Sequence, residues 1–254
     1  MIATDRSRLH RYCQRLRASA KTTGWRTVVN QLVASLWWRI DPRQAPMRAV
    51  MRENDSFDAR FGTDTRGEMS LENAGIAAAE AALGNGVYRA IPASHFRAAL
   101  QHLDIRFEDF TFLDYGSGKG KALLLAADYP FKRIVGVEYS PLLHETALSN
   151  IRRCQNQSKR CNELQAVLAD ARTYDPPGDP LVCFFFNPFD SSVWRSVLGR
   201  LQASFAMNPR PIHLVYVNVR DVAELEDIFP DFPIFIPVVR TKTCRILSAG
   251  AGTH

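Results

Sequence analysis

The sequence has no long apolar run, and no stretch of its 254 residues approaches the about 18–20 apolar residues that a membrane-spanning helix needs. It begins MIATDRSRLHRYCQRLR, in which no apolar segment follows the charges, so we expect no secretory signal. Cysteine is scarce: the five cysteines form no CxxC pair, and the two nearest, Cys154 and Cys161, have no histidine at metal-ligand spacing. These absences disfavour a disulfide framework and a zinc site, so we expect no metal, reduced thiols and a cytoplasmic location.

Acidic residues are rare in one part of the chain only. Residues 1–54 contain 11 basic and 3 acidic residues, a net charge of +8, whereas the remaining 200 residues contain 21 basic and 23 acidic residues, a net charge of −2. The overall charge of +6 is therefore a property of an N-terminal segment. We interpret this segment as an arm that recruits a substrate or partner, with RNA or DNA, an acidic protein and anionic lipid left open.

The first hundred residues contain helical patterns interrupted by a polar stretch. A basic amphipathic helix is predicted over residues 6–20 from the spacing of Leu9, Tyr12, Cys13 and Leu16. A stronger stripe predicts a second helix that ends before Pro42, from Trp25, Val28, Val29, Leu32, Val33, Leu36, Trp37 and Ile40. Residues 41–70 lose this periodicity and predict a loop, and residues 71–83 and 93–103 predict two further helices.

From residue 110 onward, short apolar runs alternate with helical patterns. The predicted strands cover residues 111–115, 133–139, 164–171, 181–187 and 212–219, followed by a hairpin over 234–239 and 243–248. The predicted helices cover residues 119–128, 141–154, 191–207 and 222–229. This alternation predicts an α/β fold with a doubly wound, mostly parallel sheet, to which the N-terminal part adds a helical extension.

The first strand runs into a glycine loop, Asp-Tyr-Gly-Ser-Gly-Lys-Gly-Lys-Ala at residues 114–122. Alternating glycines let the backbone turn tightly and approach a ligand closely. A phosphate-binding P-loop would need a glycine at position 115, which is tyrosine, and a hydroxyl residue at 122, which is alanine. A dinucleotide fingerprint would need a glycine at 121, which is lysine. A nicotinamide oxidoreductase stays a competing interpretation, because it too would place an acid at Glu138.

Polar residues follow the predicted strands where each of them ends. In a parallel sheet the carboxyl ends of the strands meet at one edge, which is where ligands bind. The first four strands place there, in order, Asp114, Glu138, Asp170 and Asn187.

The motif Asp-x-Gly-x-Gly-x-Gly, with acids at the next two strand ends and Asn-Pro-Phe at the fourth, resembles the class I S-adenosylmethionine (SAM) dependent methyltransferases over about residues 86–220. The resemblance implies SAM as the cofactor. It implies that Asp114 organises the methionine amino group and that Glu138 takes the ribose hydroxyls. The other implied cofactor-binding residues are Gly116, Gly118 and Gly120 in the loop, Asp170 and Ala171 at the adenine, and Asn187 facing the methyl group.

The segment before the glycine loop indicates which groups of these methyltransferases the sequence resembles. Tyr88-x-x-x-Pro92 ahead of DYGSGKGKALLLAA is similar to the bacterial DxGSGKG group. It is also similar to the non-SET protein-lysine methyltransferases, in which the tyrosine and proline are spaced more closely. The resemblance implies Asn187 and Tyr88 as catalytic residues that orient a neutral amine. The predicted acceptor is a nitrogen of a protein side chain or small molecule; the alternatives are a nucleic-acid methyltransferase that uses the basic arm and a non-catalytic nucleotide-binding module.

The predicted domain division is residues 1–54 as the basic helical extension, 55–100 as a loop and helices that cap the cofactor site, and 101–254 as the SAM-binding domain. The polar loop over residues 57–67 is either a surface connector or a lid over SAM, with Asp64 or Thr65 near the ligand. Lys119 and Lys121 are expected to be solvated residues at the start of a helix, and Cys183 is expected in the core.

Overall fold

A computed structural model describes residues 24–81, 87–154, 159–161, 163–217 and 226–250. The chain divides into two compact units, Met1–Arg52 and Glu53–His254. The three-part division expected from the sequence stays a prediction.

In the first unit, helix α2 (Trp25–Ile40) confirms the second predicted helix and ends, as expected, before Pro42. Asp41 follows it, and its side chain accepts a hydrogen bond from the backbone N–H of Arg43 to begin the short 3₁₀ helix η1 (Pro42–Gln44). The helix predicted over residues 6–20 lies outside the described residues.

The loop predicted over residues 41–70 is wrong for most of its length, because helix α3 covers Ala45–Phe61. Its two buried residues, Asn54 and Asp58, are polar, so the helix shows no apolar stripe in the sequence. Phe57 and Phe61, one turn apart, are the aromatic residues of this helix, and their ring centroids lie 4.7 Å from each other.

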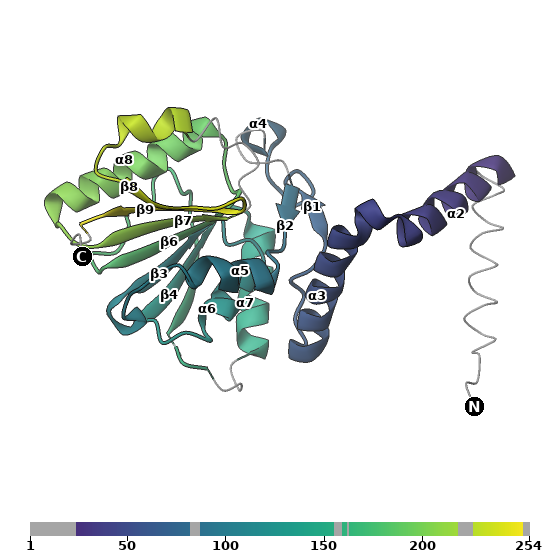
Figure 1. Cartoon of the computed structure of the whole chain (residues 1–254), viewed down its shortest axis with the longest axis horizontal. Coiled ribbons are helices and arrows are strands. Elements are labelled where there is room, and N and C mark those ends of the chain that lie inside the picture. Colours follow the sequence, from purple (N-terminus) through teal and green to yellow (C-terminus); the bar gives the residue numbers. More distant parts are fainter. Residues whose placement is uncertain (1–23, 82–86, 155–158, 162, 218–225, 251–254) are drawn as a thin grey trace. The chain divides into compact units, whose positions relative to one another are not determined.

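The second unit is built on a seven-stranded sheet with the order β5-β4-β3-β6-β7-β9-β8 (Figure 1). The parallel strands are β3 (Thr111–Tyr115), β4 (Arg133–Glu138), β5 (Leu164–Leu168), β6 (Leu181–Phe186) and β7 (Ile212–Val217). The antiparallel pair β8 (Ile236–Arg240) and β9 (Cys244–Ala249) confirms the predicted closing hairpin. Because β3 lies between β4 and β6, the strand order reverses there, which creates a crevice beyond its carboxyl end.

Helices cover both faces of this sheet, which confirms the doubly wound α/β class (Figure 1). Helices α5 (Ala93–Leu100), α6 (Lys121–Ala126) and α7 (Pro141–Arg153) contribute to the core on one face, and α8 (Ser191–Met207) to the core on the other. Of the helix predicted over residues 222–229, residues 222–225 lie outside the described residues, residues 226–228 are helical, and a 3₁₀ turn, η3, covers Phe229–Asp231.

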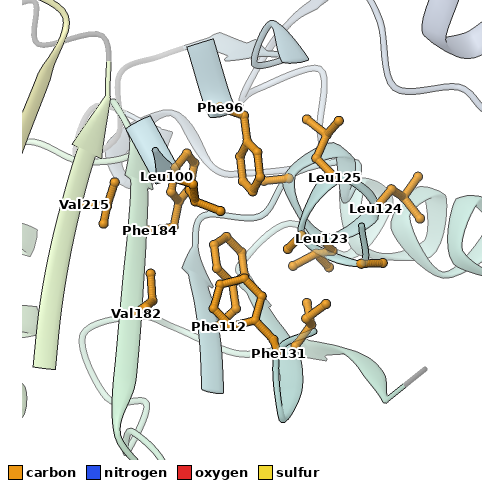
Figure 2. Close-up of a cluster of buried hydrophobic side chains, with 14 of the residues drawn as sticks. Phe96, Leu100, Phe112, Leu123, Leu124, Leu125, Phe131, Val182, Phe184 and Val215 are labelled. Atoms are coloured by element: carbon orange, nitrogen blue, oxygen red, sulfur yellow. The ribbon is translucent and has the colours of Figure 1, made fainter. Parts of the chain in front are cut away.

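The central strands are apolar without alternation because each of their faces is buried. Neighbouring residues of β3 divide between the two cores: Phe112 joins the first and Leu113 the second. In the first core the rings of Phe96, Phe112 and Phe184 lie together, with centroid separations of 5.1–5.8 Å (Figure 2). Cys183 is fully buried in the second core, as expected.

A small antiparallel pair stands beside the main sheet. Strands β1 (Glu68–Ser70) and β2 (Val87–Arg89) form it, and the short helix α4 (Ala78–Ala81) lies between them in the chain. The helix predicted over residues 71–83 is therefore confirmed only for one turn, because residues 71–75 form turns and 82–86 lie outside the described residues. A further 3₁₀ turn, η2 (Phe107–Asp109), precedes β3.

The first core predicts a large effect of truncating Phe184, which is fully buried. We expect Phe184→Ala to lower the free energy of unfolding by about 3–5 kcal/mol, because it removes buried apolar area and leaves a cavity. Urea denaturation measures this. Met207→Ala is the control, because Met207 is 89% exposed and its truncation is expected to cost less than about 0.5 kcal/mol.

Candidate functional site

A cavity of about 1080 Å³, part of it open to solvent, lies at the carboxyl ends of β3, β4 and β6. It brings together all but one of the predicted site residues, namely Tyr88, Asp114, Gly116, Gly118, Glu138, Asp170, Ala171 and Asn187. They come from four strand ends and from β2, so residues far apart in sequence meet at the switch point of the sheet. The exception is Gly120, which packs elsewhere.

The glycine loop is shaped by three residues with positive φ: 76° at Gly116, 54° at Gly118 and 81° at Gly120. A Cβ on Gly116 would stand 2.8 Å from the Cβ of Pro188, and a Cβ on Gly118 would collide with the ring of Tyr88. A Cβ on Gly120 would instead stand 3.1 Å from the Cβ of Ala147 on α7. Gly116 and Gly118 therefore allow Pro188 and Tyr88 to pack closely against the loop, whereas Gly120 allows α6 and α7 to approach each other.

Glu138, the last residue of β4, holds the glycine loop in place. One carboxylate oxygen accepts the backbone N–H of Gly118 at 2.7 Å, and the other accepts that of Ser140 at 2.8 Å. Burial raises the pKa of this carboxyl, although both backbone hydrogen bonds oppose the rise. An acid at this place can still accept hydroxyl hydrogen bonds from a ligand, because each carboxylate oxygen has two lone pairs.

Asp114, near the end of β3, is a buried carboxyl without a strong charge partner. Its burial, and next the negative charge of Glu138, raise its pKa to about 8. At neutral pH the free protein therefore holds Asp114 mainly protonated. A cationic group placed beside it would reverse this and favour the carboxylate.

Asp170 follows β5 and belongs to an ion-pair chain at the rim of the cavity. It accepts the backbone N–H of Arg172 at 2.8 Å and pairs with the Arg172 guanidinium at 2.7 Å. The same guanidinium reaches Glu80 of α4 at 2.9 Å. Burial acts to raise the pKa of Asp170, but the hydrogen bonds from Arg172 lower it more. Arg172 and Glu80 were not foreseen, because no motif marks them.

The hydroxyl of Tyr88 is hydrogen-bonded to the backbone. It donates to the backbone carbonyl of Thr65 at 2.5 Å, and burial holds its pKa well above the usual range. The hydroxyl is thus used to attach β2 to the residues before β1, and it is the ring, packed against Gly118, that contributes to the cavity. The catalytic role expected of Tyr88 stays a prediction.

Asn187 lies at the end of β6 in a strained conformation. With φ at 47°, it is the one residue other than glycine that has a positive φ in the described part of the chain. Its side-chain oxygen accepts a hydrogen bond of 2.7 Å from the hydroxyl of Tyr216 on the adjacent strand β7. Tyr216 therefore fixes the orientation of the amide, a partnership that strand pairing creates and the sequence does not reveal.

Residues 62–66, which we call the strap, lie between α3 and β1. The buried carboxylate of Asp58 accepts hydrogen bonds from Thr63, Thr65 and Arg66. Asn150 of α7 binds both backbone groups of Asp64 and also the carbonyl of Lys119 in the glycine loop. The strap is thereby attached to α7 and to the glycine loop.

The described lining of the cavity includes neither Asp64 nor Thr65, so the geometry gives no support to the strap as a lid. Asp64 pairs instead with Lys119, whose Nζ lies 3.0 Å from its carboxylate. Lys119 is 7% exposed and Lys121 is 2% exposed, so the expectation that both are solvated is wrong.

Among the residues that the structure describes, none of the helices is long and apolar enough to cross a membrane. The same part of the chain holds no group of three or more His, Cys, Asp or Glu residues placed to bind a metal ion.

No protein-family model matches the chain, and no curated protein matches it. Among solved structures it is similar to the pyocyanin biosynthetic protein PhzM, with a TM-score of 0.50 and 14% identity over 84% of this chain and 70% of that one. This chain has the Rossmann-like fold. Two further structures have lower TM-scores. Magnesium protoporphyrin IX methyltransferase ChlM from Synechocystis, with bound SAM, has a TM-score of 0.37 and 16% identity over 54% of this chain and 67% of that one. TrmN from Thermus thermophilus has a TM-score of 0.45 and 17% identity over 62% of this chain and 48% of that one. The matched region thus spans about half of TrmN.

The close approach at Gly118 gives a testable prediction. We expect Gly118→Ala to lower the free energy of unfolding by about 1–3 kcal/mol more than Gly67→Ala, because its Cβ must displace the ring of Tyr88. Gly67 is the matched control: its φ is 92°, yet a Cβ added there would meet nothing within 4 Å. Chemical denaturation compares them, and equal losses would show that only the positive φ matters.

The raised pKa of Asp114 predicts an unusual pH dependence of stability. Because the folded-state pKa, about 8, exceeds the unfolded value, the contribution of this group to stability is complete in acid and is lost as the pH rises through 8. Asp114→Asn should therefore stabilise the protein relative to wild type increasingly between about pH 6 and about pH 8.5 in thermal unfolding. Asp170→Asn replaces a group with a lowered pKa, so its stability should differ from that of wild type by the same amount over this whole pH range. A constant difference for Asp114→Asn as well would contradict the assignment.

Proposed function

We propose that the chain is a SAM-dependent methyltransferase. The observation that carries the proposal is that one cavity at the switch point collects Asp114, Glu138, Asp170 and Asn187 around a glycine loop. The resemblance of the sequence motifs supports the same conclusion. A cytoplasmic location is part of the proposal.

The residues around the cavity fit the parts of SAM. Asp114 would hold the methionine amino group, and the backbone of Gly116 and Gly118, which lines the cavity, would lie against the carboxypropyl and ribose groups. Glu138 would accept hydrogen bonds from the ribose hydroxyls, and Asp170 with Ala171 would meet the adenine.

When bound, SAM supplies a methyl group that an in-line displacement transfers. The chain has to align an acceptor with this methyl group and exclude water. Asn187, whose amide Tyr216 orients, and the apolar side chains of Phe186, Pro188 and Phe189 line the part of the cavity at the end of β6. They are the proposed acceptor-side residues. The loss of a proton from Asp114, which a ligand ammonium group would favour, is the proton movement that binding requires.

The proposed acceptor is a nitrogen of a protein side chain or of a small molecule. The similarity of the Tyr88 and DxGSGKG segments to bacterial DxGSGKG proteins and to non-SET protein-lysine methyltransferases supports it. A nucleic-acid acceptor is the second candidate, because residues 1–54 carry a net charge of +8. Incubating the protein with radiolabelled SAM and fractionated cell extract separates these candidates by the fraction that takes up label.

Cofactor binding can be tested first by calorimetry with SAM. We expect Glu138→Gln to weaken the affinity for SAM about 10-fold or more, because the ribose hydroxyls lose a charged acceptor. Glu145→Gln, an exposed acid on α7, is the matched control and should leave affinity unchanged. Undiminished affinity in Glu138→Gln would contradict the site, and binding of NADH but not of SAM would favour an oxidoreductase. Once a substrate is known, near-wild-type turnover by Asn187→Ala would remove the proposed role of Asn187.

A further inference from the structure

Lys121, the first residue of α6, is a buried cation at the cavity. The residue is 2% exposed, and it lines the same cavity as Asp114, Gly116 and Gly118. Charged lysine side chains are seldom buried unless an anionic group pairs with them, because leaving water costs the ammonium its hydration.

The partners of this ammonium are neutral. Its Nζ donates a hydrogen bond to the side-chain oxygen of Asn54 and lies 4.8 Å from the ring centroid of Phe57, both on α3. These contacts use one of three N–H donors and add a cation–π attraction. In the described residues no carboxylate lies within ion-pair distance of Lys121.

The carboxylates near Lys121 are committed to other groups. Both oxygens of Glu53 accept hydrogen bonds from Ser94, at 2.6 Å from its backbone nitrogen and 2.8 Å from its hydroxyl. Asp58 is hydrogen-bonded to the residues of the strap. Arg97 of α5 adds a further positive charge. Lys119 differs: it has its own ion pair with Asp64.

We propose that Lys121 binds the carboxylate of the methionine part of SAM. The inference rests on the proposed function and adds to it a residue that recognises the single anionic group of this cofactor. The amino-acid end of SAM carries an ammonium and a carboxylate, and an acidic and a basic residue, Asp114 and Lys121, are among the residues that line the cavity. The carboxylate of the ligand would thus pair with the ammonium of Lys121, which has no carboxylate partner among the described residues.

The electrostatics of Lys121 give this contact a pH signature. Burial lowers its pKa to about 8; Glu53 and Asp58 act in the opposite direction, and Arg97 acts with burial. A bound carboxylate favours the protonated amine, so binding at a pH above 8 takes up a proton at this position. Asp114 has the opposite effect, because an ammonium group bound beside it favours the loss of its proton. Variants of Lys121 and of Asp114 therefore separate the proton uptake of one residue from the proton release of the other.

The test compares SAM with decarboxylated SAM, which lacks only the carboxylate. We expect the wild-type protein to bind SAM more tightly than decarboxylated SAM. Lys121→Met should weaken SAM binding about 10- to 100-fold but change the affinity for decarboxylated SAM less than about 2-fold. The reason is that the substitution removes a charge-assisted hydrogen bond to the carboxylate, which only SAM carries. Calorimetry measures all four affinities. Lys119→Met is the matched control and should bind both ligands in the wild-type ratio.

An equal loss for both ligands in Lys121→Met would overturn the proposal and assign Lys121 to holding α3. An unchanged affinity for SAM would overturn it as well. If wild type binds neither ligand, the proposed function fails, which is a different result from failure of Lys121 alone. Should Lys121→Met not fold, Asp114→Asn provides a second measurement. Calorimetry of this variant at about pH 8.5, in buffers of different ionisation enthalpy, measures how many protons are taken up when a ligand binds. We expect proton uptake when SAM binds but none when decarboxylated SAM binds. Equal uptake with the two ligands would contradict the proposal.

Discussion

The carboxylate of Glu138 fixes the geometry on which the site depends. It accepts one N–H from the glycine loop and one from the start of α7, so a single side chain at the end of β4 positions the segments that follow two adjacent strands. This arrangement requires a charged group to be buried beside a second acid, Asp114. Burial, and next the charge of Glu138, raise the pKa of Asp114, and a cationic ligand beside it would oppose both effects.

Buried polar side chains support the outer side of the same loop. Asp58 shapes the strap, and Asn150 joins the strap to the glycine loop from a position 86 residues further along the chain than Asp64. Each donor in this network has an acceptor, which is the condition under which polar groups can be buried without loss of stability. The loop therefore has a rigid support on one side and the cavity on the other.

The sheet could be predicted from the sequence because strands buried on both faces are continuous apolar runs, and the strand-end residues because parallel strands deliver them to one edge. Helix α3 could not, because the face it buries is Asn54 and Asp58. The hydroxyl of Tyr88, the partnership of Tyr216 with Asn187 and the burial of Lys121 depend on contacts between elements distant in sequence. Local patterns do not encode such contacts, and a lysine in a sequence is ordinarily solvated.

The contact between Gly116 and Pro188 has a consequence for how this protein can diverge. Residue 188 limits residue 116: a side chain at 116 has no space while the Cβ of Pro188 stands so near, and the positive φ of Gly116 disfavours one in any case. Natural variants should therefore keep glycine at 116 even where residue 188 changes, so that the end of the first strand is constrained by the residue that follows the fourth.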